Sequence, residues 1–134
     1  MSDYNAPIIE EFRANKGRVG GRWEGRDLLL LTTRGRRSGR EYTTPMVYTR
    51  GGNRLLVYAS QGGSPDHPDW YLNLVANPGV IVEVGGERYE ARATPLEGDE
   101  RDREFAAQAE RWPQFGAYQA QTDRVIPVVA LTRI

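Results

Sequence analysis

Two glycine-rich turns limit the fold of this chain more than any other feature of the sequence. The turns at 51–53 and 85–86 each join two segments of strand length, which are 42–50 with 54–60, and 80–84 with 88–94. Glycine takes the backbone angles that tight turns require, and strands joined by such a turn run antiparallel. The sequence therefore predicts two β-hairpins and an antiparallel sheet.

Six segments in all have the length and composition of strands: 28–33, 42–50, 54–60, 80–84, 88–94 and 125–132. Pro45 predicts that the second is an edge strand or carries a bulge. Helices are expected at 6–15, 68–76 and 100–111, with a short one after Pro113. Because helices do not alternate with strands, we expect one domain over 1–134 that is mainly β with α insertions (α+β). Its six antiparallel strands would form a closed or split β-barrel, and 1–26 would form an N-terminal helix and loop.

The charge and composition exclude several classes of function. Lys+Arg and Asp+Glu both number 18, so no nucleic-acid partner is indicated. The absence of cysteine rules out disulfides and thiolate chemistry. The N-terminus has no apolar signal region, and the longest apolar run, Leu28–Leu31, is too short to span a bilayer. We expect a cytoplasmic protein.

The segment RGRRSGR at 34–40 is the densest positive feature. Its arginines supply guanidinium groups, and its glycines let the backbone turn and expose N–H groups, a combination that suits phosphate or carboxylate. A solvated hairpin tip has the same composition, so this segment alone leaves both interpretations open.

The stretch ASQGGSPDHPDWYLNLVANP at 59–78 joins a strand end to a helix start. Glycines allow close backbone approach to a ligand, and a helix N-terminus favours anions. His67 is the only histidine and has no second metal ligand or catalytic partner in the sequence. Later in the chain, Trp112, Phe115 and Tyr118 recur every three residues. They predict either a helix packed on the barrel or an aromatic wall beside a flat ligand.

With EEFRANKGRVGG (10–21), LLLLTTRGRRSGREYTTPMVY (28–48) and QTDRVIPVVAL (121–131), these motifs resemble those of the deazaflavin-dependent nitroreductases. Proteins of that family are split-barrel oxidoreductases, similar to FMN-binding split barrels, that use coenzyme F420. The resemblance implies a cofactor site that comprises Arg36, Arg37, Ser38, Tyr42, Thr43, Thr44, Pro45, Met46, Val47, Tyr58, Ala59, Ser60, Gln61, Asp69, Trp70, Tyr71, Leu72, Asn73 and Phe115. Arg37 would hold the phosphate of the cofactor tail.

The resemblance also implies a reaction, in which reduced F420 gives a hydride from its ring to a quinone, a nitroaromatic or a similar acceptor. Ser60 and Tyr118 would be catalytic, and Trp112, Phe115 and Tyr118 would form the substrate pocket. Nitroreductases that activate prodrugs carry tyrosines at these three positions, so two hydroxyl groups are missing here. Two alternatives are a non-catalytic protein that binds F420 or a lipid-like ligand, and an FMN-dependent oxidoreductase. The chain would be a monomer or homodimer, and a lipid quinone would bring it to the inner membrane face.

Overall fold

The computed structural model describes residues 2–21 and 27–134, so the loop expected over 16–26 is described only as far as Gly21. The helical elements are α1 (Ser2–Ala14), the 3-10 turn η2 (Gln61–Gly63), α2 (Asp69–Ala76), α3 (Gly98–Arg111) and α4 (Pro113–Ala120). Within the described residues the strands are β1 (Leu28–Arg34), β2 (Glu41–Val47), β3 (Thr49–Gly51), β4 (Arg54–Tyr58), β5 (Gly79–Val84), β6 (Glu87–Pro95) and β7 (Val128–Arg133). None of the described helices is long and apolar enough to cross a bilayer.

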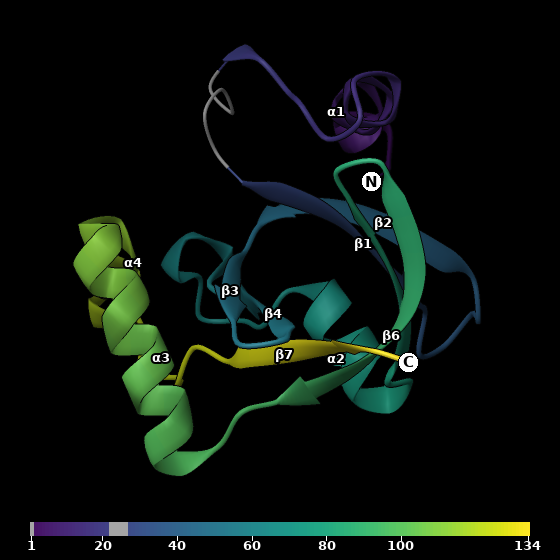
Figure 1. Cartoon of the computed structure of the whole chain (residues 1–134). Coiled ribbons are helices and arrows are strands. Elements are labelled where there is room, and N and C mark those ends of the chain that lie inside the picture. The colour runs from purple at the N-terminus through teal and green to yellow at the C-terminus, as the bar shows by residue number, and fades with distance from the viewer. Residues whose placement is uncertain (1, 22–26) are drawn as a thin grey trace.

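All the strands belong to one antiparallel sheet with the order β2-β1-β5-β6-β7-β4-β3. The two end strands of the sheet, β2 and β3, are consecutive in the chain, with only Tyr48 between them. The sheet therefore curls so that its two edge strands come together. Figure 1 shows the curled sheet with α1 above it and with α3 and α4 on one side. The predictions of a mainly β chain, of antiparallel pairing and of an edge position for Pro45 are confirmed.

The predicted count of six strands is wrong by one, because the segment 42–50 contains two strands. Up to Val47 the chain pairs with β1, and from Thr49 it pairs with β4 instead. The Tyr48 amide between them donates to the Asp27 carbonyl at 3.2 Å rather than to a neighbouring strand of the sheet. The last strand also starts later than expected, at Val128, because Pro127 has no N–H to donate to a strand partner.

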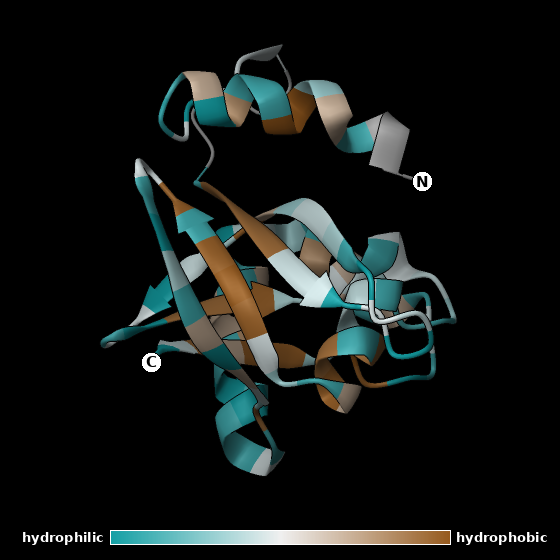
Figure 2. Cartoon of the chain, turned by 90° about the vertical axis from the view of Figure 1, so that its right-hand side faces the viewer, coloured by the Kyte–Doolittle hydropathy of each residue, from teal (hydrophilic) through white to brown (hydrophobic). Residues whose placement is uncertain are grey.

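The main core lies inside the curl of the sheet. Leu29 and Leu31 of β1 point inward and join Leu74 of α2, which closes this interior. Leu28 and Leu30 point outward and pack beneath α1. Because β1 is buried on both faces, its apolar residues run without alternation, and Figure 2 shows this strand as continuously hydrophobic at its start.

Helices cover two regions of the outer face. Helix α1 packs through Phe12 and is tied to β5 by Arg13, whose Nε and Nη2 donate to the Glu83 carboxylate at 3.0 and 2.8 Å. Helices α3 and α4 lie elsewhere on the sheet (Figure 1), where Phe105 and Phe115 pack on the outer side of β4 and β7. The candidate site lies between the β1–β2 loop and the start of α2, and none of its lining residues belongs to α1, α3 or α4.

Candidate functional site

The loop between β1 and β2 holds the RGRRSGR segment in a fixed shape. The Gly35 amide donates to the Arg40 carbonyl at 2.7 Å, and the Gly39 amide donates to the Gly35 carbonyl at 3.0 Å. A Cβ atom at Gly35 would lie 2.8 Å from both Ser38 Oγ and Tyr42 Cε2, so a larger residue there would have to displace these two side chains. The segment is therefore an ordered turn whose shape depends on its glycines.

Arg36 joins this loop to the start of α2. Its backbone N–H and its Nη1 both donate to Asn73 Oδ1, at 3.2 and 2.8 Å. Its Nη2 also lies 3.5 Å from Asp69 Oδ1. Three predicted site residues from segments more than 30 residues apart in sequence therefore meet, and part of the Arg36 charge is already balanced.

A hollow of about 450 Å³ lies at this junction, and we term it the arginine hollow. It is lined by Gly35, Arg36, Arg37, Ser38, Tyr42, Asp69 and Asn73, and all of these except Gly35 were predicted site residues. The Arg37 side chain is exposed and has no ion pair or hydrogen bond with any residue in the described part of the chain. Arg37 is thus the guanidinium group that an anionic ligand can engage.

The predicted contact segment Tyr42–Val47 alternates between the two faces of the sheet. Met46 is opposite Leu29 and packs on the inner core, whereas Val47 is opposite Leu28 and packs on the outer clusters. A ligand on one face of β2 therefore meets the side chains of only half of this segment. On α2, Trp70 and Tyr71 are half-buried and also pack on the inner core, and Leu72 beside them is half-buried.

Arg124 holds the strand end at Ala59 and Ser60. Its Nη1 donates to the Ala59 carbonyl at 3.1 Å, its Nη2 to the Ser60 carbonyl at 2.8 Å, and its Nε to the Ser64 carbonyl at 2.8 Å. Sequence reasoning missed this residue, although it lies in the quoted segment 121–131. Its partners are backbone carbonyls 60 to 65 residues away, and backbone acceptors leave no side-chain signal in a sequence.

His67 has a partner that the sequence did not reveal. Its Nδ1 lies 3.1 Å from Arg124 Nη1, and its ring contacts Tyr71 with centroids 4.8 Å apart. Burial, together with the Arg124 charge, lowers the pKa of His67 below its ordinary value. His67 therefore has a hydrogen-bond partner in Arg124, which is neither a metal ligand nor a general acid or base, and the structure favours a neutral imidazole whose Nδ1 accepts from Arg124.

The late aromatic series forms one cluster around Phe115. This ring is buried and makes edge contacts with Tyr58 at 5.7 Å and with Tyr118 at 5.5 Å, while Trp112 lies 6.0 Å away. Phe115 therefore packs the helix against the sheet, which is one of the two interpretations of this spacing. Trp112 and Tyr118, on either side of it, are half-buried.

The strand end carrying Ser60 lies against α4. The Gly63 amide donates to the Ser60 carbonyl at 2.9 Å, and a Cβ atom at Gly63 would lie 3.0 Å from the Tyr118 carbonyl oxygen. Gln61, between them in sequence, is exposed and takes a positive φ of 44°. The two predicted catalytic residues, Ser60 and Tyr118, therefore belong to segments in direct contact.

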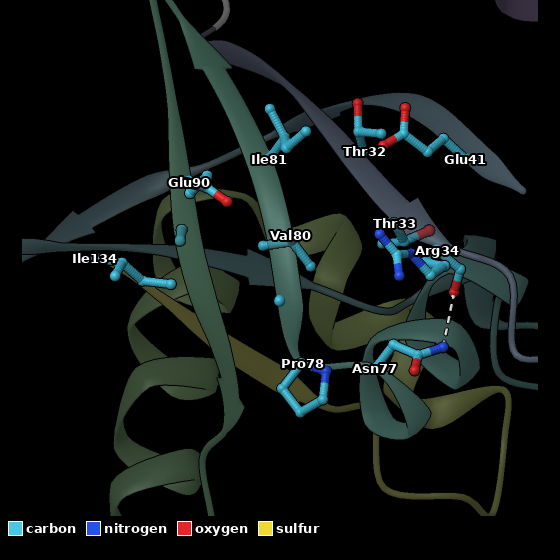
Figure 3. A pocket seen from close by; sticks show the side chains of 12 residues that line it. Thr32, Thr33, Arg34, Glu41, Asn77, Pro78, Val80, Ile81, Glu90 and Ile134 are labelled. Atoms are coloured by element: carbon cyan, nitrogen blue, oxygen red, sulfur yellow. Dashed lines mark hydrogen bonds between the residues drawn. The ribbon is translucent and has the colours of Figure 1, made fainter. Parts of the chain in front are cut away.

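A second hollow, of about 350 Å³, lies where β1 ends and β5 begins (Figure 3). Asn77 Nδ2 donates to the Arg34 carbonyl at 3.3 Å across one side of it. Its charged residues are one arginine and two glutamates, Arg34, Glu41 and Glu90. This balance does not select an anion, in contrast to the arginine hollow, and sequence reasoning named none of the three as a site residue.

The fold and site together define a curled-sheet β protein with an arginine-lined hollow beside α2. Comparison with known proteins gives the family. Residues 8–133 match the family described as F420H(2)-dependent quinone reductase. An F420H(2)-dependent quinone reductase of Mycobacterium tuberculosis is 38% identical over 131 residues, covering 91% of this chain and 85% of the relative.

Two solved structures have the same fold. One, an F420-H2 dependent reductase, has a TM-score of 0.71 and 37% identity, covering 79% of this chain and 94% of that one. The other, described as a domain-swapped dimer, has a TM-score of 0.74 and 33% identity, covering 97% and 98%. This chain belongs to the F420H(2)-dependent quinone reductase family. Membership confirms the predicted resemblance, the enzyme class and F420 as cofactor, and it leaves the FMN alternative without support.

Proposed function

We propose that this protein uses reduced F420 to reduce a quinone, and that the arginine hollow holds the acidic tail of the cofactor. The observation that carries the proposal is the arrangement of two arginines there: Asn73 fixes Arg36, and Arg37 is left free. Relatives at 38% identity are named for the same reaction. Nitroaromatic compounds are secondary candidates, since Trp112 and Phe115 lack the hydroxyl groups of tyrosine.

The residues of the arginine hollow fit the chemistry of the F420 tail, which carries a phosphate and carboxylates. Guanidinium groups bind such oxygens through charge-assisted hydrogen bonds, which are stronger than neutral ones. Ser38 adds a hydroxyl group and Tyr42 a phenol at the wall of the same hollow. Residues of β2 and of the first turn of α2 would then contact the ring end of the cofactor.

When bound, reduced F420 supplies a hydride from C5 of its deazaflavin ring. The protein contributes position and hydrogen bonds. Arg124 fixes the backbone at Ser60, so this hydroxyl group would orient the ring or the acceptor. The Tyr118 hydroxyl would stabilise negative charge that develops on the acceptor or pass on a proton through water.

We further propose that the curled sheet is a split barrel and that residues 1–134 form a single domain. A homodimer is supported by the relative that is described as a domain-swapped dimer. A cytoplasmic location, with contact at the inner membrane face when the acceptor is a lipid quinone, stays a prediction.

The test replaces Arg37 with alanine and measures F420 binding by fluorescence quenching. The loss of a charge-assisted contact should weaken binding by about 1.5–3 kcal/mol, nearer the lower value because Arg37 is exposed. Arg40→Ala is the matched control, since Arg40 is exposed on the same loop but does not line the hollow. Equal affinity of the Arg37 variant and the wild type would remove Arg37 from the tail site.

Two further measurements separate the remaining functions. Titration with FMN and F420 side by side should favour F420, because the cationic hollow suits its acidic tail. An acceptor screen with reduced F420 should then show oxidation that depends on quinone. Tight F420 binding without such oxidation would instead identify a non-catalytic binding protein.

A further inference from the structure

Gln108 carries an unused polar group in the interior of the protein. It lies near the end of α3 and is only 2% exposed. Its amide oxygen Oε1 has no hydrogen-bond partner, and its amide nitrogen has none in the described part of the chain. A buried polar group without a partner is destabilising, so such groups are rare and often have a function.

A cavity of about 270 Å³ adjoins this side chain, between the β2–β3 bend and the end of α3. Its lining, which defines what we term the Gln108 cavity, is Asp27, Val47, Tyr48, Thr49, Gln108, Arg111 and Trp112. Sites for drug-sized ligands have volumes of about 300–1,000 Å³, so this one suits a head group of one or two rings. It is separate in its lining from the arginine hollow.

The lining provides an apolar wall and a small set of polar groups. Val47 and the Trp112 indole give surfaces against which a flat ring can pack. The Thr49 hydroxyl is already bonded to the Tyr58 hydroxyl at 2.7 Å. The Gln108 amide is therefore the buried neutral group left to bind a ligand in this cavity.

An amide suits the two redox states of a quinone. Its N–H groups can donate to a carbonyl oxygen of the quinone and to a hydroxyl oxygen of the hydroquinone, whereas Gln108 Oε1 itself is fully buried. A hydrocarbon side chain of the same size would bind neither oxygen.

We propose that Gln108 hydrogen-bonds a ring oxygen of the quinone in the Gln108 cavity and so selects acceptors that carry such an oxygen. This assignment rests on the proposed function, because the quinone is the acceptor there. Gln108 acts as a specificity residue that contacts substrate, and Trp112 forms the wall against which the ring packs.

The test uses Gln108→Leu, with 1,4-naphthoquinone as the probe and naphthalene as the ring without oxygens. Binding is followed by tryptophan fluorescence with and without F420; the chain has no cysteine that the quinone could alkylate. Quinone affinity should fall about fivefold to tenfold, the size of one hydrogen bond, while affinity for naphthalene should not fall. The Tm should rise by about 4 °C, because the unpaired amide is gone.

Gln114→Leu is the control, since Gln114 is exposed and outside the cavity; it should leave quinone affinity unchanged. If the leucine variant does not fold, Gln108→Met gives the same comparison. Unchanged quinone affinity of the Gln108 variant would overturn the assignment. A lower Tm with weaker binding of quinone, naphthalene and F420 alike would also overturn it.

Wild-type protein that binds F420 and reduces other acceptors but not naphthoquinone would overturn the assignment and leave the proposed F420 chemistry standing. Failure to oxidise reduced F420 with any acceptor, despite naphthoquinone binding that needs Gln108, would overturn the proposed function alone.

Discussion

Replacement of Arg124 by glutamine should loosen the segment that carries Ser60 and destabilise the whole protein. In the structure one guanidinium group donates to the carbonyl oxygens of Ala59, Ser60 and Ser64. A glutamine side chain is shorter, carries no charge and has a single NH₂ group, so it cannot bond all three.

The size of the effect follows from what each carbonyl would lose. Ala59 is fully buried, and among the described residues its carbonyl accepts only from Arg124, so it would be left without a partner at a cost of about 1–3 kcal/mol. The Ser60 carbonyl keeps the Gly63 amide, and Ser64 is only half-buried as a residue. We expect a total loss of about 2–4 kcal/mol in the free energy of unfolding.

Urea unfolding measured by circular dichroism gives this quantity directly. Arg103→Gln is the matched control, because Arg103 is exposed on α3 and should tolerate the change within about 0.5 kcal/mol. Arg124→Lys keeps the charge but not the forked set of donors, so its free energy of unfolding should lie between those of Arg124→Gln and Arg103→Gln. If Arg124→Gln is as stable as the control, the three hydrogen bonds do not stabilise the strand end, and Arg124 does not hold Ser60 in place.

Three further changes test other parts of the structure. The pKa of His67 is lower in the folded protein than in the unfolded chain, so its contribution to stability is present above the unfolded value of about 6.5 and is lost as the pH falls. Unfolding of wild type and His67→Gln at pH 7.5 and 5.5 should therefore show a smaller pH effect in the variant. Gly63→Ala should destabilise by at least about 1 kcal/mol more than Gly62→Ala, because both have positive φ but only Gly63 faces the Tyr118 backbone. Phe115→Ala should cost about 3–5 kcal/mol in the same urea assay if this ring is a core residue.

Local signals in the sequence were enough to predict most of the fold. Glycine turns predicted the hairpins, and the apolar runs predicted where strands lie. The strand count failed at Tyr48, where the chain exchanges one strand partner for another without any turn residue. Such an exchange depends on which strands are neighbours in space, and neither propensity nor periodicity contains that information.

The site was predictable only where its residues are close in sequence. The arginine loop could be recognised because its charges and glycines fall within seven residues. The bond from Arg36 to Asn73, the hold of Arg124 on Ala59 and the unpaired amide of Gln108 each depend on tertiary packing. A side chain that bonds a distant backbone, or bonds nothing, looks in sequence like any other polar residue.

The place of β7 in the sheet has a consequence for how the protein is made. This strand, Val128–Arg133, lies between β6 and β4 and pairs with both. Among the described strands β7 is the last to be synthesised, and β3 and β4 join the rest of the sheet through it, so the curl cannot close before β7 is available. Pairings between distant segments are slow to form, and unpaired strands are prone to aggregate. Closure of the curl therefore waits for β7, and we expect β4 to present an unpaired edge until β7 binds it.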